Sequence, residues 1–141
     1  MREILFRGKR TDGEWVEGSL LKVTLNGQTA HLIFGDNFIL ICDDVKSLSH
    51  ALVDPATVGQ FTGLIDKNGR KIFEGDILSS KIIEEDNGNV IFEKEVVIWH
   101  RNAWHTRTVG HGYLHQMDEK ECLPISEVIG NIHDKLVEAN G

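Results

Sequence analysis

The sequence has few of the residues that cross-link chains or interrupt strands: two cysteines and two prolines among 141 residues. Cys42 and Cys122 lie far apart without a CxxC spacing, which indicates neither a disulfide framework nor a structural zinc site. No apolar run approaches the ~18 residues that span a bilayer, and no charged-then-apolar leader is visible. We therefore expect a protein of the reducing cytoplasm with no membrane segment.

Basic residues are also scarce, because 15 Lys and Arg stand against 22 Asp and Glu, for a net charge of −7. An acidic chain repels phosphate backbones, so general binding to nucleic acid is disfavoured. The start, MREILFRGKR, is an exception with four basic residues close together, which we interpret as a solvated first hairpin. A chain of this length buries roughly 70% of its unfolded surface, so it needs no metal or disulfide to fold.

Fourteen glycines separate short apolar runs, a pattern typical of β-strands. Within residues 1–54, the Asn26–Gly27 pair predicts a tight hairpin turn. DNFILIC (36–42) is a further predicted strand, and the segment 43–59 adds a strand near 50–53 and one helical turn from Pro55. The sequence therefore predicts an N-terminal antiparallel β unit over 1–54.

Residues 55–141 contain five strand-like segments joined by tight turns, and IHDKLVEAN (132–140) predicts a short terminal helix. Short strands of this kind suit a small barrel that removes its own edges. The apolar, β-branched segment Glu127–Ile132 comes last, and we expect it to pair with 75–83. The predicted fold is mostly β, with a C-terminal small β-barrel over 55–141.

The stretch GLIDKNGRKIFEGDIL (63–78) has three interpretations. Counted from Asp66, the glycine and the acid fall at the wrong positions for an EF-hand loop. No Ser or Thr follows the basic residues, and no helix is indicated, so a phosphate loop is also excluded. What is left is a hairpin with Asn68–Gly69 at the turn and an Asx bond from Asp66. The stretch is therefore predicted to be a structural hairpin and not a ligand-binding loop.

Catalytic arrangements are not apparent. Glu74 and Asp76 could form an acid–base pair on one strand face, but Gly75 interrupts the strand and no nucleophile is near, so we interpret both as solvated edge carboxylates. No serine has a GxSxG context. We predict that the chain is not an enzyme, with no catalytic residues and no cofactor.

Four histidines crowd into WHRNAWHTRTVGHGYLH: His100, His105, His111 and His115. Three converging imidazoles can bind zinc, but no HExxH or other known spacing is present. If the segment were one strand, period two would place His100 and His105 on opposite faces. We therefore predict no metal site.

The same segment is rich in the side chains of interaction hot spots and of base-stacking surfaces. Tryptophans also fill β-barrel cores, so both roles stay open for them. The candidate interaction surface consists of Trp99, His100, Arg101, Trp104, His105, Arg107 and Tyr113.

A family resemblance covers nearly the whole chain. VDPATVGQFTGLIDKNGRKIFEGDIL followed by VIGNI, together with the opening MREILFRGKR, resembles the YopX family of bacteriophage and prophage proteins. The resemblance implies a mostly β fold with SH3-like barrel character and a protein made in a bacterial cytoplasm. It implies no catalytic residues, and the 96–115 segment is this chain's own.

Three functions are compatible with these observations. The first is a non-enzymatic binding or assembly module that acts through self-association, as a homo-oligomer, or through a protein partner. The second is single-stranded nucleic-acid binding by a barrel face that carries Trp99, Trp104, Arg101 and Arg107, which the net charge disfavours. The third is a metal-dependent enzyme that uses the histidines of 100–115, which the absent motifs disfavour.

Overall fold

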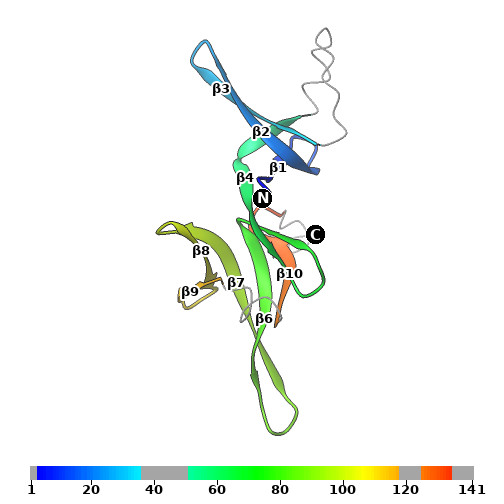
Figure 1. Ribbon diagram of the computed structural model, residues 1–141, viewed down its shortest axis with the longest axis vertical. Coiled ribbons are helices and arrows are strands. Elements are labelled where there is room, and N and C mark those ends of the chain that lie inside the picture. The colour runs from blue at the N-terminus through cyan, green and yellow to red at the C-terminus, as the bar shows by residue number, and fades with distance from the viewer. Residues whose placement is uncertain (1–2, 36–50, 118–124, 135–141) are drawn as a thin grey trace. The chain divides into compact units, whose positions relative to one another are not determined.

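A computed structural model describes residues 3–35, 51–117 and 125–134, and within these ranges the chain forms ten β-strands and no α-helix (Figure 1). The paired strands run antiparallel. The prediction of a mostly β protein is therefore confirmed. The strands are β1 (Phe6–Arg10), β2 (Trp15–Leu25), β3 (Gln28–Phe34), β4 (Leu52–Ile65), β5 (Lys71–Phe73), β6 (Asp76–Glu84), β7 (Val90–His100), β8 (Ala103–Thr108), β9 (Leu114–Gln116) and β10 (Ser126–Asn131).

The chain divides into two compact units, 1–61 and 62–141, and strand β4 runs from the first into the second. The division predicted after residue 54 falls inside β4 and stays a prediction. The helical turn expected from Pro55 is wrong, because Pro55 lies in β4. Proline holds the residue before it in extended geometry, which fits a strand as well as a turn. The predicted strand at 36–42 lies outside the described residues, as does the predicted terminal helix beyond Asp134.

In the N-terminal unit the strand pairing is circular. β1 pairs with both β2 and β4, and β3 pairs with β2 and β4. Asn26 and Gly27 have φ values of 53° and 78°, so the predicted two-residue turn is confirmed as one that needs positive φ at both positions. Gly8 lies against the buried side chains of Ile33 and Val53, where a Cβ atom would come within 3.0 Å of each. The small core of this unit is therefore closely packed.

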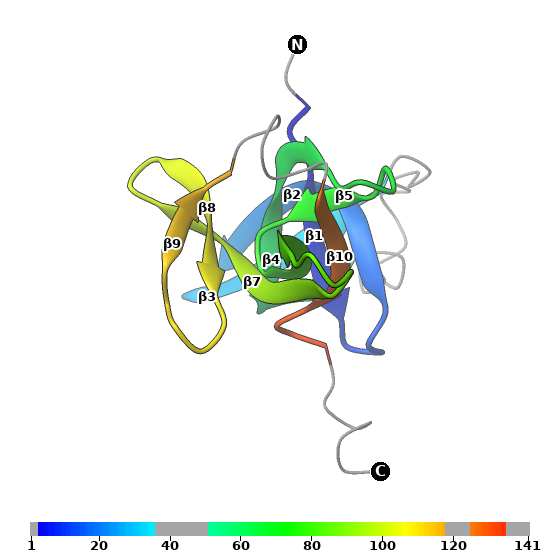
Figure 2. The same ribbon diagram turned by 90° about the horizontal axis from the view of Figure 1, so that it is seen from below.

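The C-terminal unit contains a second sheet with the order β10-β6-β7-β8-β9. Its core includes a cluster of four buried side chains, Ile72, Leu78, Val97 and Val128. Strand β10 pairs with β6, which confirms the predicted pairing of 127–132 with 75–83. Figure 2 shows the pair β8 and β9 at one side of this sheet. The SH3-like barrel character expected for this unit stays a prediction.

The β6–β7 hairpin is longer than its neighbouring strands. β10 reaches along β6 only as far as Ser80, and β8 reaches along β7 only as far as Glu95. Residues 81–94 therefore form a two-stranded extension, here called the β-arm, which projects past the ends of β8 and β10 (Figure 1). Two-stranded ribbons are only marginally stable in water without further support. The β-arm is thus the part of the sheet with the least local support.

Candidate functional site

The loop that begins at Asp66 is held by its own carboxylate. Oδ1 of Asp66 accepts backbone N–H bonds from Asn68 and Arg70, each at 2.9 Å, and Oδ2 accepts one from Val128 at 2.9 Å. The backbone N–H of Asp66 donates to the Arg70 carbonyl at 2.8 Å and closes the turn. The Asx bond predicted from the sequence is therefore confirmed, and the same side chain also reaches strand β10.

This loop covers the edge of β10 that faces away from β6. Lys67 donates its backbone N–H to the Ser126 carbonyl at 3.0 Å, and the Arg70 guanidinium donates to the Val128 carbonyl at 3.2 Å. The ammonium of Lys67 lies 3.8 Å from the carboxylate of Glu127. The charged residues of the loop thus bind this protein's own sheet edge, which is a structural role.

Asp76 is a buried structural carboxylate with only 1% of its surface exposed, so the expectation of a solvated edge position is wrong. Its Oδ2 accepts the backbone N–H of Phe73 at 2.8 Å, and its Oδ1 accepts the side-chain amide of Asn131 at 3.1 Å. Gly75, at φ 88°, turns the chain so that the carboxylate points back into the turn. The prediction assumed that Glu74 and Asp76 lie on one strand, where alternate side chains share a face. It failed because 74–75 is a tight turn rather than a strand.

The pKa of Asp66 reflects two opposing effects. Burial raises the pKa of this carboxyl group, but the three backbone N–H donors and the Arg70 charge outweigh burial, so the pKa lies below its ordinary value of 3.8. A carboxylate with a lowered pKa stabilises the folded state above its unfolded-state pKa. That stabilisation is lost as the pH falls through the folded-state pKa.

We accordingly expect the free energy of unfolding to fall when the pH is lowered from 5 through and below 3.8, and to fall less in an Asp66→Asn variant. Urea denaturation followed by circular dichroism between about pH 2.5 and 7 measures both slopes. Equal slopes for the two chains in the acid range would contradict a stabilising ionised Asp66.

The β7–β8 hairpin carries most of the candidate interaction residues. Its turn consists of Arg101 and Asn102, with φ values of 48° and 64°, and Trp99 pairs with Trp104 across it. Positive φ at both positions defines the same two-residue turn type that Asn-Gly favours. Because the turn reverses the chain after His100, the candidate residues lie on two strands rather than one.

The two strands of the hairpin sort the candidates onto two faces. Trp99 and Trp104 lie on the face of Val97, which is the core side, whereas His100, His105 and Arg107 lie on the opposite, outer face. His100 and His105 therefore share a face, with ring centroids 5.4 Å apart at 89°. The expectation of opposite faces is wrong, since it assumed a single strand.

One tryptophan of the pair packs against the core, and the other lies at the surface. Trp104 packs against the hydrophobic core, and Trp99 is 50% exposed. Their rings meet edge to face, with centroids 4.9 Å apart at 72°. The buried Nε1 of Trp104 has no hydrogen-bond partner within the described part of the chain. Trp99 is thus an exposed aromatic side chain that the partly buried Trp104 holds in place.

The remaining candidates follow the hairpin. Tyr113, in the connection from β8 to β9, is 66% exposed, and the imidazole of His111 stacks on it with centroids 5.9 Å apart. His115 pairs with Thr106 across β8 and β9. Of the four histidines, His100 and His105 thus contact each other, whereas His111 stacks on Tyr113 and His115 lies on β9. Within the described ranges, no group of three or more His, Cys, Asp or Glu side chains is placed to hold a metal ion.

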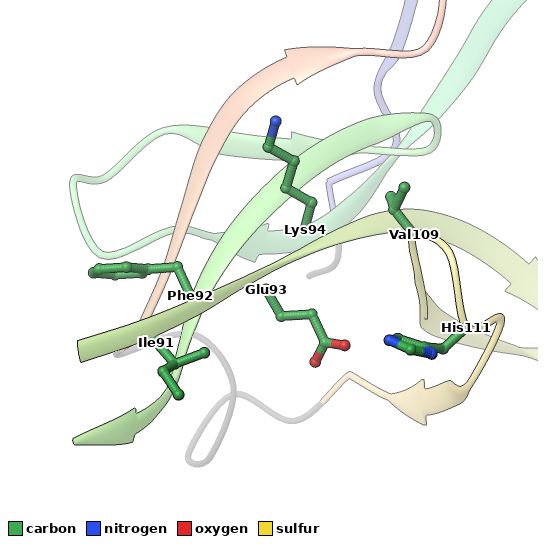
Figure 3. A pocket seen from close by; sticks show the side chains of 6 residues that line it. All are labelled: Ile91, Phe92, Glu93, Lys94, Val109 and His111. Atoms are coloured by element: carbon green, nitrogen blue, oxygen red, sulfur yellow. The ribbon is translucent and has the colours of Figure 1, made fainter. Parts of the chain in front are cut away.

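A shallow hollow of about 480 Å³ lies between the β-arm and the connection from β8 to β9 (Figure 3). The Glu93 carboxylate and the His111 ring point toward the same space, and Phe92 and Lys94 point to the other side of the strand. Sequence reasoning missed this feature, for which the signal was a β7 segment much longer than its neighbour β8. The hollow is lined by Ile91, Phe92, Glu93, Lys94, Val109 and His111.

Two antiparallel sheets, glycine-dependent turns and an exposed aromatic hairpin define a small, mostly β protein. The chain belongs to the YopX protein family, whose profile matches residues 5–136. It is also similar to the crystal structure of protein EF1440 from Enterococcus faecalis, with 20% identity, 100% coverage of both chains and a TM-score of 0.48. The comparison with curated proteins gives no match. In the described part of the chain, no helix has the length and apolar character needed to cross a membrane.

Proposed function

We propose that the chain is a phage-derived, non-enzymatic binding module that acts in the cytoplasm of a bacterial host through self-association or a protein partner. The observation that carries this proposal is a concentration of exposed apolar side chains between residues 90 and 114, each 37–66% exposed. Monomers rarely leave large apolar patches uncovered. These side chains are Val90, Ile91, Phe92, Trp99, Val109, Tyr113 and Leu114.

The aromatic members of this set are already held in position. Trp99 is held by Trp104, and Tyr113 is held by the stacked ring of His111. An aromatic side chain that is ordered before binding loses little conformational entropy when a partner covers it. Tryptophan and tyrosine are also the residue types most enriched at energetic centres of interfaces. Trp99 and Tyr113 are therefore the first residues to test.

We expect the wild-type chain to sediment above its monomer mass of 15.9 kDa or to capture a protein from a bacterial lysate. In a Trp99→Ser/Tyr113→Ser variant, the affinity for a second copy or for the captured protein should fall at least tenfold. Sedimentation velocity and quantitative pull-down measure these effects. The matched control is Leu21→Ser/Val23→Ser, which alters two exposed apolar residues of the N-terminal unit. A monomeric chain that captures no protein, or equal losses in both variants, would contradict the proposal.

Single-stranded nucleic-acid binding is the second candidate, and the outer face of β7 and β8 is the observation in its favour. Lys94, Arg107, His100 and His105 lie on this face. Trp99 lies on the other face, however, so base stacking and phosphate contacts would not share one surface. Retention on a single-stranded DNA column that falls with salt, and is lost in Lys94→Ala/Arg107→Ala, would favour this candidate over the first.

A further inference from the structure

We infer that the outer face of the second sheet is a docking surface for an acidic amphipathic helix of a protein partner. The inference rests on the proposed function and names the chemistry of the partner. The surface lies on the side of β7 opposite Trp99, so the two proposals can fail separately. Six side chains define it, and it is here called the basic face: Ile77, Lys81, Lys94, Val96, Ile98 and Arg107.

The strand register brings these side chains onto one face. Val96 lies opposite Ile77 on β6 and opposite Arg107 on β8. Opposed residues of antiparallel strands project to the same side, and side chains alternate along each strand. Lys94 therefore shares the face of Val96, and Figure 3 shows its side chain pointing away from the hollow. The buried Val97 points to the other side, so the basic face is not the face that packs on the core.

The centre of the basic face is aliphatic. Ile77, Val96 and Ile98 are neighbours on β6 and β7, and each keeps part of its surface exposed. On the same face, Phe92 on β7 is 57% exposed and Leu114 on β9 is 42% exposed. Removal of such apolar surface from water is favourable, so a partner with apolar side chains gains affinity here.

The rim of the basic face is positive, although the whole chain has a net charge of −7. Lys94 and Arg107 are exposed, and within the described residues neither forms an ion pair. Lys81, which lies opposite Phe92, adds a third cation. Like charges held on one surface attract a partner of the opposite sign and speed its association. The partner is therefore acidic.

The protein's own carboxylates do not neutralise this rim. Among the described side chains of the basic face and its borders, Glu127 on β10 is the one acid, and it lies opposite Ser79. Its carboxylate accepts the side-chain amide of Asn68 at 3.2 Å and lies 3.8 Å from the ammonium of Lys67. Glu127 is thus bound to the loop at the edge of the sheet, and the carboxylates that match Lys94 and Arg107 have to come from a partner.

The occupant is a helix because a sheet face offers no backbone hydrogen bonds. A strand adds at a sheet edge, whereas a segment that lies across a face has to satisfy its own N–H and C=O groups. An α-helix does so, and a helix with an apolar stripe is a common cover for a sheet face. Its stripe would contact Val96 and Ile98, and acidic side chains beside the stripe would contact Lys94 and Arg107.

Single-stranded nucleic acid is the other anionic polymer to consider. Its bases stack on aromatic rings, whereas the centre of the basic face consists of Val96 and Ile98. The exposed Trp99 lies on the opposite side of β7. An acidic helix therefore matches both the centre and the rim of the basic face, and nucleic acid matches the rim alone.

The first test is fluorescence anisotropy of the full chain with a labelled peptide of about 18 residues, or roughly five helical turns, in which glutamates flank a leucine stripe. Its affinity should fall at least tenfold in Lys94→Glu/Arg107→Glu, and should fall as sodium chloride is added. Lys22→Glu/Lys71→Glu is the matched control, because it changes the net charge equally at two exposed positions on β2 and β5. No binding to the wild type, or equal affinity in the two variants, would overturn the inference.

The second test changes the probe. Glutamine in place of the glutamates, or serine in place of the leucines, should each lower the affinity at least tenfold, because the basic face recognises charge and apolar surface together. A serine peptide that binds as tightly as the leucine peptide would contradict this. So would a single-stranded oligothymidylate that binds more tightly than the acidic peptide, which would favour nucleic acid instead.

The Trp99→Ser/Tyr113→Ser variant separates this inference from the proposed function. It should bind the acidic peptide as the wild type does, since Trp99 lies on the other face of β7. A tenfold loss of peptide affinity in this variant would move the docking surface to that face and overturn the inference. A chain that self-associates through Trp99 and Tyr113 but does not bind the peptide would also overturn it and leave the proposed function standing.

Discussion

Replacement of Asp66 by alanine is expected to lower the free energy of unfolding by about 3 kcal/mol, since three backbone N–H groups lose their acceptor and each buried unsatisfied donor costs about 1–3 kcal/mol. The loss falls on both the turn at 66–70 and the docking of β10. Urea denaturation at pH 7, followed by circular dichroism, measures the change.

Asp12 provides a matched control for this substitution. Its carboxylate accepts the Glu14 N–H at 2.9 Å, in an Asx contact like that of Asp66, but Asp12 is exposed and bonds no distant strand among the described residues. Asp12→Ala should therefore cost much less than Asp66→Ala. Similar losses in the two variants would mean that the local turn, and not the link to Val128, is what Asp66 contributes.

Gly18→Ala is expected to destabilise the N-terminal unit by about 3 kcal/mol, at the upper end of what overpacking costs. A Cβ atom on Gly18 would lie 1.9 Å from the carbonyl oxygen of Phe34 and 2.5 Å from its carbon. These are backbone atoms of the paired strand β3, so the pairing beside Ser19 must open to admit a methyl group. Thermal unfolding followed by circular dichroism measures the loss.

The control for this substitution is Gly27→Ala. Gly27 has positive φ, but no described atom lies within 4 Å of the place that a Cβ atom would occupy, so only backbone strain of about 1 kcal/mol is expected. A Gly18→Ala chain as stable as the wild type would show that β2 and β3 can separate at this point without cost.

The turns that were predicted correctly depend on residues close together in the sequence. Asn26–Gly27 and the Asx bond of Asp66 depend on residues adjacent in the chain, and both were predictable. The pairing of 127–132 with β6 was predictable because an apolar, β-branched segment late in the chain needs a partner strand. The hydrogen bond from the Val128 N–H to Asp66 links the turn to β10. It was not predictable, because it joins residues 62 positions apart in the chain.

The site itself was harder to predict. Arg101–Asn102 is not a typical pair for a two-residue turn, so the position of the turn was not identified and the histidines were assigned to the wrong faces. Pro55 was interpreted as a break, although it lies within β4. The hollow beside the β-arm depends on the unequal lengths of β7 and β8, which hydrophobic patterns locate only approximately.

The Asp66 loop also limits polymerisation. Strand-by-strand growth into a fibril requires every added copy to offer a fresh edge on the far side of its sheet. At β10 the amide and carbonyl of Val128 are already bound to Asp66 and Arg70, so an incoming strand finds no free ladder there. The edge of β10 at Val128 is therefore closed to the addition of a further strand.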